Sequence, residues 1–361
     1  MLASARSGLL ALALLFSLTA AGTPPALAEA TPSPAPSLER GQDDARAIEM
    51  LRASMAAARS VSYVAQVETI RWGPSGAIAS IAKVEHLAPA QTHRIFLAPA
   101  DVFGDIVVVR GPATYSYDTK HQQVVVSRGP TYDIQTAAND NFGLLLANYR
   151  PVLGNLETVA GRPSFPCSLV NRYTGERTMR LWIDSETHLV LEKETYHANG
   201  TLGSRILFDQ IRYTRDIPSA VFATPVPAGY SIVQGRTSGT PSTDLDRVLK
   251  NAGFSPAGPH YLPEGFTIVS ADVNVLRGVK TLHLLYSDGV RSLSLFENAA
   301  SAAADFGNLK PTSTKVEGRD AQYVADGPTT LLSWREAGLM LALVGDLDIK
   351  ELKAIAASVI P

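Results

Sequence analysis

The chain has 361 residues, of which 45% are hydrophobic and 18% are charged, and its formal net charge at pH 7 is −2. This composition is ordinary for a folded globular protein, long enough for two domains, and it excludes a disordered chain. The near-neutral charge gives no electrostatic reason to expect binding to nucleic acid or to an anionic membrane surface.

Residues 1–28 have the features of a signal peptide. Arg6 supplies a positive start, Gly8–Ala21 is an apolar run, and Ala26–Ala28 forms a small-x-small cleavage site. The apolar run is short for a membrane span. We therefore expect an exported protein, cleaved near Ala28 to a mature chain of 361 − 28 = 333 residues. The alternative is an uncleaved anchor.

Cys167 is the only cysteine. Because no cysteine stands at the cleavage point, the chain is not expected to be a lipoprotein. Because there is only one cysteine, no intramolecular disulfide can form. A lone thiol in an exported protein is most often a small buried hydrophobe, which we favour over a catalytic nucleophile.

Residues 29–42 form a Pro/Ser-rich linker whose composition cannot build a packed core. A helix is predicted over residues 44–59, because apolar residues recur there at helical spacing. This stripe predicts that the helix lies on a sheet, and its expected members are Ile48, Leu51, Met55 and Ala58.

Residues 61–126 contain a series of short β-type runs separated by turn signals such as Gly73-Pro74 and Gly111-Pro112. This spacing predicts antiparallel strands rather than βαβ units. A second helix is expected over residues 136–149. Its apolar side would consist of Phe142, Leu145, Leu146 and Tyr149.

Residues 168–213 predict an antiparallel meander of four strands. Met179, Leu181 and Ile183 alternate with polar neighbours at period two. Asn199-Gly200 is a hairpin signal for a type I′ turn. A sheet this wide has a face that must be covered by the rest of the chain.

These elements predict an α+β fold with two domains. Residues 43–216 would form a curved antiparallel half-barrel with covering helices, and residues 217–242 a connector rich in Pro, Gly, Ser and Thr. Residues 243–361 would form a smaller α+β domain, with helices over 244–252 and 348–359. The last helix would begin at the N-cap Asp348 and bury Leu352, Ile355, Ala356 and Val359.

The sequence lacks several common catalytic motifs. The chain has no G-x-S-x-G, no phosphate-binding glycine loop and no H-E-x-x-H, and its seven histidines form no close pair at metal-ligand spacing. We predict no enzyme activity, no cofactor and no metal site.

Two carboxylate groupings have alternatives. Asp184, Glu186 and His188 could share a strand face as a metal site, but a polar turn is the favoured interpretation. Glu192 and Glu194 could serve as a glycosidase pair, but a solvated strand face is favoured.

The curved sheet is expected to enclose an apolar cavity that suits an acyl chain or a lipidated partner. Most bulky side chains of such a sheet are core. The candidates for lining the cavity are Phe96, Ile106, Val108, Tyr115, Tyr117, Trp182 and Phe208.

Residues 260–266 read HYLPEGF and residues 285–289 read LYSDG. With Leu343–Leu347 and Arg180–Asp184, these motifs resemble the RseB/MucB family of periplasmic regulators of the envelope-stress sigma factor. The resemblance covers about residues 42–361. It implies a first domain like the lipoprotein carriers LolA and LolB. It also implies a second domain that engages the periplasmic part of a membrane-bound anti-sigma factor and shields it from proteolysis until a lipid-like signal binds.

Two function classes follow. The first is a regulator that binds a protein partner through its second domain, and the alternative is a lipid or lipoprotein carrier that uses only the half-barrel. An enzyme of unrecognised type is a third possibility. For the regulator, the candidate partner contacts are Tyr261, Leu262, Phe266 and Tyr286, set against the alternative that all four are core of the small domain.

Overall fold

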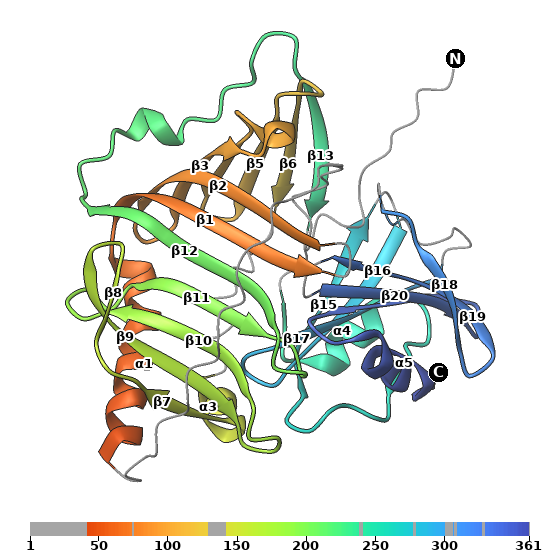
Figure 1. The fold of residues 1–361 in the computed structure, drawn as a ribbon. Coiled ribbons are helices and arrows are strands. Elements are labelled where there is room, and N and C mark those ends of the chain that lie inside the picture. The colour runs from red at the N-terminus through yellow and green to blue at the C-terminus, as the bar shows by residue number, and fades with distance from the viewer. Residues whose placement is uncertain are drawn as a thin grey trace.

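The computed structural model describes residues 42–73, 76–128, 142–237, 241–276, 279–299, 306, 309–326 and 329–360. It has the predicted α+β fold, with an open curved sheet followed by a smaller second domain (Figure 1). The predicted signal peptide and nearly all of the predicted linker lie outside the described residues.

The first domain is built on one antiparallel sheet. From one side to the other, its strands run β6, β5, β4, β3, β2, β1, β12, β11, β10, β9, and both β7 and β8 pair with the outer side of β9. The bounds are β1 (Tyr63–Gly73), β2 (Gly76–Leu87), β3 (Gln91–Ala98), β4 (Ile106–Arg110), β5 (Ala113–Asp118), β6 (Gln123–Arg128), β7 (Tyr149–Leu153), β8 (Glu157–Val159), β9 (Arg162–Asn171), β10 (Arg177–Asp184), β11 (Val190–Tyr196) and β12 (Leu202–Tyr213).

The predicted meander is confirmed as strands β9 to β12, but the predicted turn at Asn199-Gly200 is wrong in type. Only Gly200 has a positive φ, of 78°, whereas a type I′ turn needs two such residues. The loop is one residue longer, because His197 N–H donates to the Thr201 carbonyl at 2.9 Å. The Asn199 carboxamide accepts from Thr201 N–H at 3.0 Å, so the asparagine stabilises the loop through its side chain.

Helices α1 (Gln42–Ser60) and α3 (Phe142–Asn148) cover one face of this sheet at its β7 end (Figure 1). Beneath them lies an apolar cluster of Leu51, Leu145, Tyr149, Cys167, Leu169, Met179, Leu181 and Ile183, which we call the α3 cluster. The predicted buried stripe of α1 is shifted by about one residue. The fully buried positions are Ala47, Leu51, Ser54 and Ala57, and these small side chains let the helix lie close to the strands.

The α3 helix begins at Phe142 among the described residues, and the predicted start at residue 136 lies outside them. The expected apolar side is confirmed. Leu145 and Tyr149 are buried in the α3 cluster, and Phe142 and Leu146 pack against it.

The opposite face is covered too. Trp182 of β10 points away from the α3 cluster and is buried with Val159, Leu189 and Leu191. At the far end of the sheet, the short 3-10 helix η2 (Ser219–Phe222) lies over β3 and β4 and buries Phe222. A second 3-10 turn, η1 (Ala100–Val102), joins β3 to β4.

Residues of the predicted connector form part of the first sheet. Strand β13 (Ser231–Thr237) pairs with β6 in parallel, with Ile232 opposite Val124. It therefore forms the edge of the sheet beyond β6. At its far end Thr237 pairs with Val275 of the second domain, so the two sheets are joined through this strand.

The second domain is an antiparallel sheet with strands in the order β15, β16, β17, β21, β20, β19, β18. The predicted helices are present as α4 (Leu245–Asn251) and α5 (Ile349–Ala357), and a two-stranded pair joins β14 (Gly258–Pro259) to β22 (Val359–Ile360). The strands are β15 (Thr267–Leu276), β16 (Val279–Ser287), β17 (Ser292–Asn298), β18 (Thr312–Val316), β19 (Arg319–Asp326), β20 (Thr329–Glu336) and β21 (Leu339–Gly345).

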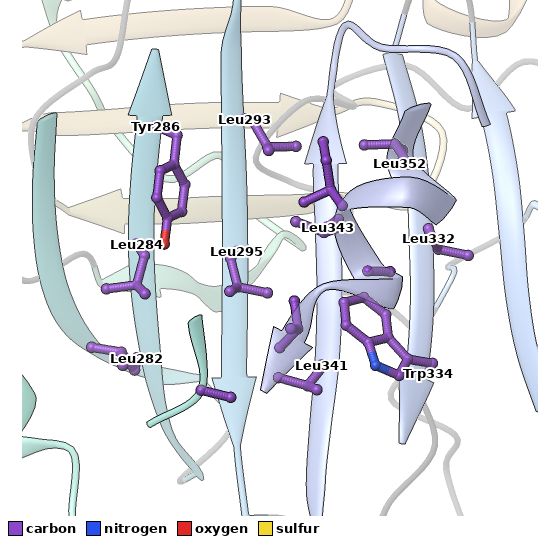
Figure 2. Close-up of a cluster of buried hydrophobic side chains, with 14 of the residues drawn as sticks. Leu282, Leu284, Tyr286, Leu293, Leu295, Leu332, Trp334, Leu341, Leu343 and Leu352 are labelled. Carbon is purple, nitrogen blue, oxygen red and sulfur yellow. The ribbon is translucent and has the colours of Figure 1, made fainter. Parts of the chain in front are cut away.

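One large core lies between this sheet and its helices. Figure 2 shows Leu282, Leu295 and Leu343 from three adjacent strands, with Trp334 from the next strand, β20, and Leu352 from α5 in the same cluster. Asp348 caps α5 as predicted, since its carboxylate accepts from Glu351 N–H at 2.8 Å. Leu352, Ile355 and Ala356 are fully buried on the inner side of the helix.

Candidate functional site

The predicted cavity residues are distributed among separate clusters. Four of them lie together on strands β4 and β5, in a cluster closed by Ile217 and Phe222. Trp182 and Phe208 lie in the cluster behind β10, and Phe96 packs with Ala82 and Val102. The four that gather under η2 are Ile106, Val108, Tyr115 and Tyr117.

The predicted partner contacts differ in exposure. Tyr261 is 44% exposed, and its hydroxyl donates to the Glu351 carboxylate at 2.7 Å. Leu262 is half-buried against the second-domain core. Phe266 and Tyr286 are buried within that core, and Figure 2 shows Tyr286 alongside Leu284. Of the four, Tyr261 and Leu262 therefore keep surface open to solvent, whereas Phe266 and Tyr286 do not.

A polar contact between the two domains lies beside these residues. The Asn148 carboxamide, at the end of α3, donates to the carbonyl oxygens of Gly265 at 2.9 Å and Asp288 at 3.0 Å. The Tyr149 hydroxyl donates to Asp288 Oδ2 at 2.6 Å. We call these contacts of Asn148 and Tyr149 with Gly265 and Asp288 the interdomain clasp.

The electrostatics of the clasp are satisfied. Asp288 is 1% exposed and is paired with Arg291 at 2.9 Å, and its other oxygen accepts from the backbone N–H groups of Val290 and Arg291. Burial, followed by the negative charge of Asp288, raises the pKa of Tyr149 far above its usual value. The phenol therefore stays protonated and donates a hydrogen bond to Asp288. A buried carboxylate with this many donors stabilises one geometry of the turn between β16 and β17.

Residues 184–188 form a turn. Arg162 pairs with Asp184 and, at 2.7 Å, with Glu186, and the Asp184 carboxylate accepts from the N–H groups of Glu186 and Thr187. Burial alone would raise the pKa of Asp184, but the hydrogen bonds from Arg162 and these N–H groups lower it to about 2. In the part of the chain that the structure describes, no three His, Cys, Asp or Glu side chains lie close enough to hold a metal ion.

The Glu192 and Glu194 pair differs from the solvated face favoured by the sequence. Glu192 is buried and pairs with Arg205 at 2.6 Å, while Glu194 accepts from the Tyr196 hydroxyl. Burial raises the pKa of Glu192 in spite of the Arg205 charge. Glu192 is thus committed to a cross-strand contact with β12, and Glu194 to a contact along its own strand, β11.

A Ser-His-Asp chain of hydrogen bonds crosses β15, β16 and β17. His283 Nδ1 lies 3.1 Å from Asp272 Oδ2, and its Nε2 lies 2.9 Å from Ser294 Oγ. This is the hydrogen-bond order of a hydrolase triad. However, His283 is only 2% exposed and its ring stacks on Phe296 at 4.6 Å. We therefore interpret the chain as a structural link between three strands.

Cys167 is fully buried in the α3 cluster, and burial raises the pKa of its thiol to about 12. The thiolate that a nucleophile needs is therefore scarce at neutral pH.

Sequence reasoning missed the clasp. The LPEGF and LYSDG segments stood out as family motifs, but nothing in the spacing of Gly265 and Asp288 pointed to Asn148, more than 100 residues away in sequence. Glu297 was also missed. It is fully buried, and it accepts from Ala257 N–H at 2.7 Å.

Parts of both domains match known family models. Residues 106–226 match the family model of the MucB/RseB N-terminal domain. Over this stretch the first domain is similar to the MucB/RseB family. Residues 257–359 match a second family model, a domain of unknown function named DUF4367, and no curated protein matches the chain.

Solved MucB structures share the fold over both domains. The Pseudomonas aeruginosa MucA/MucB complex is 19% identical, with a TM-score of 0.58, over 88% of this chain and 99% of that chain. MucB in complex with MucA(peri) is 19% identical, with a TM-score of 0.56, over 87% of this chain and 98% of that chain. A MucB structure is 18% identical, with a TM-score of 0.53, over 88% and 98%. Among the described residues, none of the helices combines the length and apolarity that crossing a bilayer requires.

Replacing Arg162 with Gln tests the buried pair at the 184–188 turn. The Asp184 carboxylate is 0% exposed, so loss of its partner is expected to lower the free energy of unfolding toward the lower end of roughly 3–5 kcal/mol. Because the pKa of Asp184 is lowered to about 2, the pair stabilises above about pH 4, and this contribution is lost as the pH falls through 2. The measurement is urea unfolding at pH 7 and pH 2. The exposed pair of Lys315 with Asp320 supplies the control, and Lys315→Gln should be nearly neutral. Equal losses for the two variants would contradict the analysis.

Replacing Glu297 with Gln tests the buried carboxyl. Burial raises the pKa of Glu297 to about 7, so its protonated form is favoured in the folded state. Its contribution to stability is present below its ordinary pKa and is lost as the pH rises through 7, by on the order of 2–3 kcal/mol. Gln keeps an acceptor for Ala257 N–H and carries no charge. Urea unfolding should therefore find the variant gaining on the wild type between pH 5 and pH 8, whereas the exposed Glu176→Gln should run parallel to it. A parallel curve for Glu297→Gln would refute the assignment.

Proposed function

We propose that this protein is a periplasmic regulator that binds the periplasmic part of a membrane-bound anti-sigma factor. Export would remove residues 1–28, leaving the half-barrel of residues 43–216 and the second domain of residues 243–361 joined by the connector. The observation that carries the proposal is the shared fold with MucB over 88% of this chain and 99% of the MucB chain, in a structure of MucB with MucA.

Three features support a binding role over catalysis. The buried carboxylates Asp184, Glu192 and Asp288 are each paired with an arginine inside the fold. His283, whose hydrogen bonds follow the order of a triad, is closed off from solvent. The family match over residues 106–226 is to a regulator family.

The test is a pull-down of detergent-solubilised membrane proteins with the mature chain, followed by mass spectrometry. Retention of one single-span protein whose cytoplasmic part binds a sigma factor would support the proposal. A titration of its purified periplasmic segment should then give saturable one-to-one binding. Retention of no single-span protein, at a protein concentration well above micromolar, would count against it.

Replacing Tyr261 with Ala tests the proposed contact surface. Tyr261 is exposed beside the half-buried Leu262, and truncating an interface tyrosine typically costs about 2 kcal/mol, or roughly thirtyfold in affinity. Isothermal titration with the periplasmic segment measures the loss. Phe103 of the first domain is 65% exposed, so Phe103→Ala serves as the control and should leave affinity unchanged. The opposite pattern would move the contact surface to the first domain.

We also propose, as the alternative, that the half-barrel binds an acyl chain. The supporting observation is the grouping of Ile106, Val108, Tyr115 and Tyr117 under η2, where Ile217 and Phe222 close the cluster. An acyl chain would replace these two side chains over the strands. Native mass spectrometry of the full chain, purified without detergent, should find acyl lipid in stoichiometric amounts. Protein that has been unfolded in urea and refolded without lipid is the blank, and equal masses for the two samples would rule out a carrier.

A further inference from the structure

The second domain contacts both edges of the first sheet. At one edge, β13 pairs with β6, and its last residue, Thr237, pairs with Val275 of β15. This contact lies where the chain itself passes from the first domain to the second. At the other edge, the turn between β16 and β17 meets α3 and β7 through the clasp. Figure 1 shows β13 and α3 at opposite ends of the half-barrel, with the second domain across its open side.

The two motif glycines are required by this contact. Gly289 has φ +93°, and a Cβ there would lie no farther than 3.0 Å from backbone atoms of Leu144 and Leu145 in α3. Gly265 has φ +86°, and a Cβ there would lie 2.8 Å from the Asn148 side chain. Backbone atoms of a helix cannot move aside as a flexible side chain can. Any side chain at position 289 therefore has to push the turn and α3 apart.

The turn is also anchored by apolar packing. Val290 packs against the α3 cluster, which otherwise consists of first-domain residues. Arg291, which pairs with Asp288, lies over the Phe266 ring at 5.4 Å. The turn thus packs Val290 against the core of the first domain, while its charged residues, Asp288 and Arg291, pair with each other on the second domain.

We infer that the LPEGF and LYSDG motifs are a docking device for the first domain, and that the interdomain clasp is a releasable strut across the half-barrel. The β13 end is fixed because the chain passes through it. Among the described residues, the α3 end is held by the clasp hydrogen bonds, the packing of Val290 and the close approach of Gly289 to α3. Release of the clasp frees the β7 edge of the sheet while the domains stay joined.

Helix α3 is the part of the first domain whose position decides whether the strut is formed. Its seven residues carry Leu145 into the α3 cluster and present their backbone to Gly289. A shift of α3 away from β7 cannot keep both contacts. The closed and open arrangements are therefore two discrete states, and a ligand or partner that prefers one of them shifts the balance.

The test compares two clasp variants with a matched control in the full mature chain. Gly289→Ala creates the clash with α3. Asn148→Asp is isosteric, removes both donations to the second domain, and still accepts from the Tyr173 hydroxyl, 2.9 Å away in the wild type. Gly338→Ala carries the same backbone strain, because Gly338 has φ +82°, but a Cβ there would meet nothing within 4 Å.

Small-angle scattering and hydrogen exchange read out the result. Both clasp variants should show a larger radius of gyration than the wild type. Amides of residues 142–149 and 286–291 should exchange at least about tenfold faster, while those of the second-domain core keep their protection. Gly338→Ala should match the wild type in both measurements. Scattering and exchange of both clasp variants that equal those of the wild type would overturn the inference.

The strut does not depend on the proposed partner, and the two can fail separately. Expansion of the clasp variants without any captured membrane protein supports the strut and counts against the proposed function. A captured partner, together with clasp variants whose radius of gyration equals that of the wild type, supports the proposed function and counts against the strut. Where both hold, a change of at least about fivefold in partner affinity for Gly289→Ala, and none for Gly338→Ala, makes the strut part of the regulation.

Discussion

An open sheet has two edges, and the unpaired backbone N–H and C=O groups along them must be paired or covered. In this protein one edge is extended by β13, which arrives from the connector and pairs in parallel with β6. The other edge, at β7 and β8, is accompanied by α1 and α3 and touched by the second domain. The shape of the whole molecule depends on this solution, because the second domain reaches from one edge to the other.

The same constraint explains where the buried charges lie. Asp184 and Arg162 lie at the turn after β10, Glu192 and Arg205 link β11 to β12, and Asp288 and Arg291 occupy the turn that meets the first domain. Each carboxylate stands where the backbone reverses or where two strands must keep register. These pairs are spread over turns and strand pairs, so each one stabilises the local geometry of the backbone around it.

Local sequence patterns were sufficient to predict most of the architecture. Period-two alternation predicted the strands of the meander, and capping chemistry at Asp348 placed the start of α5. Failures arose where a long-range contact overrode a local preference. Nothing near Ile232 in sequence revealed that β13 joins β6, since Pro and Gly around it resemble a linker. The buried side of α1 is set by how closely the sheet approaches, and this favoured Ala47 and Ala57 over Ile48 and Met55. The clasp could not be predicted for the same reason, because Asn148 acquires its role only when two distant turns arrive beside it.

The position of β1 has a consequence for the order in which the chain folds. β1 lies in the middle of the first sheet, between β2 and β12, with Tyr63 opposite both His86 and Tyr213. As the chain emerges from its N-terminus, the hairpin of β1 and β2 can form early, but the other side of β1 stays unpaired until residue 213 arrives. Closing so long a loop is slow. The emerging half-sheet therefore carries an unpaired strand edge for that interval, and at this stage its free backbone N–H and C=O groups can pair with another chain.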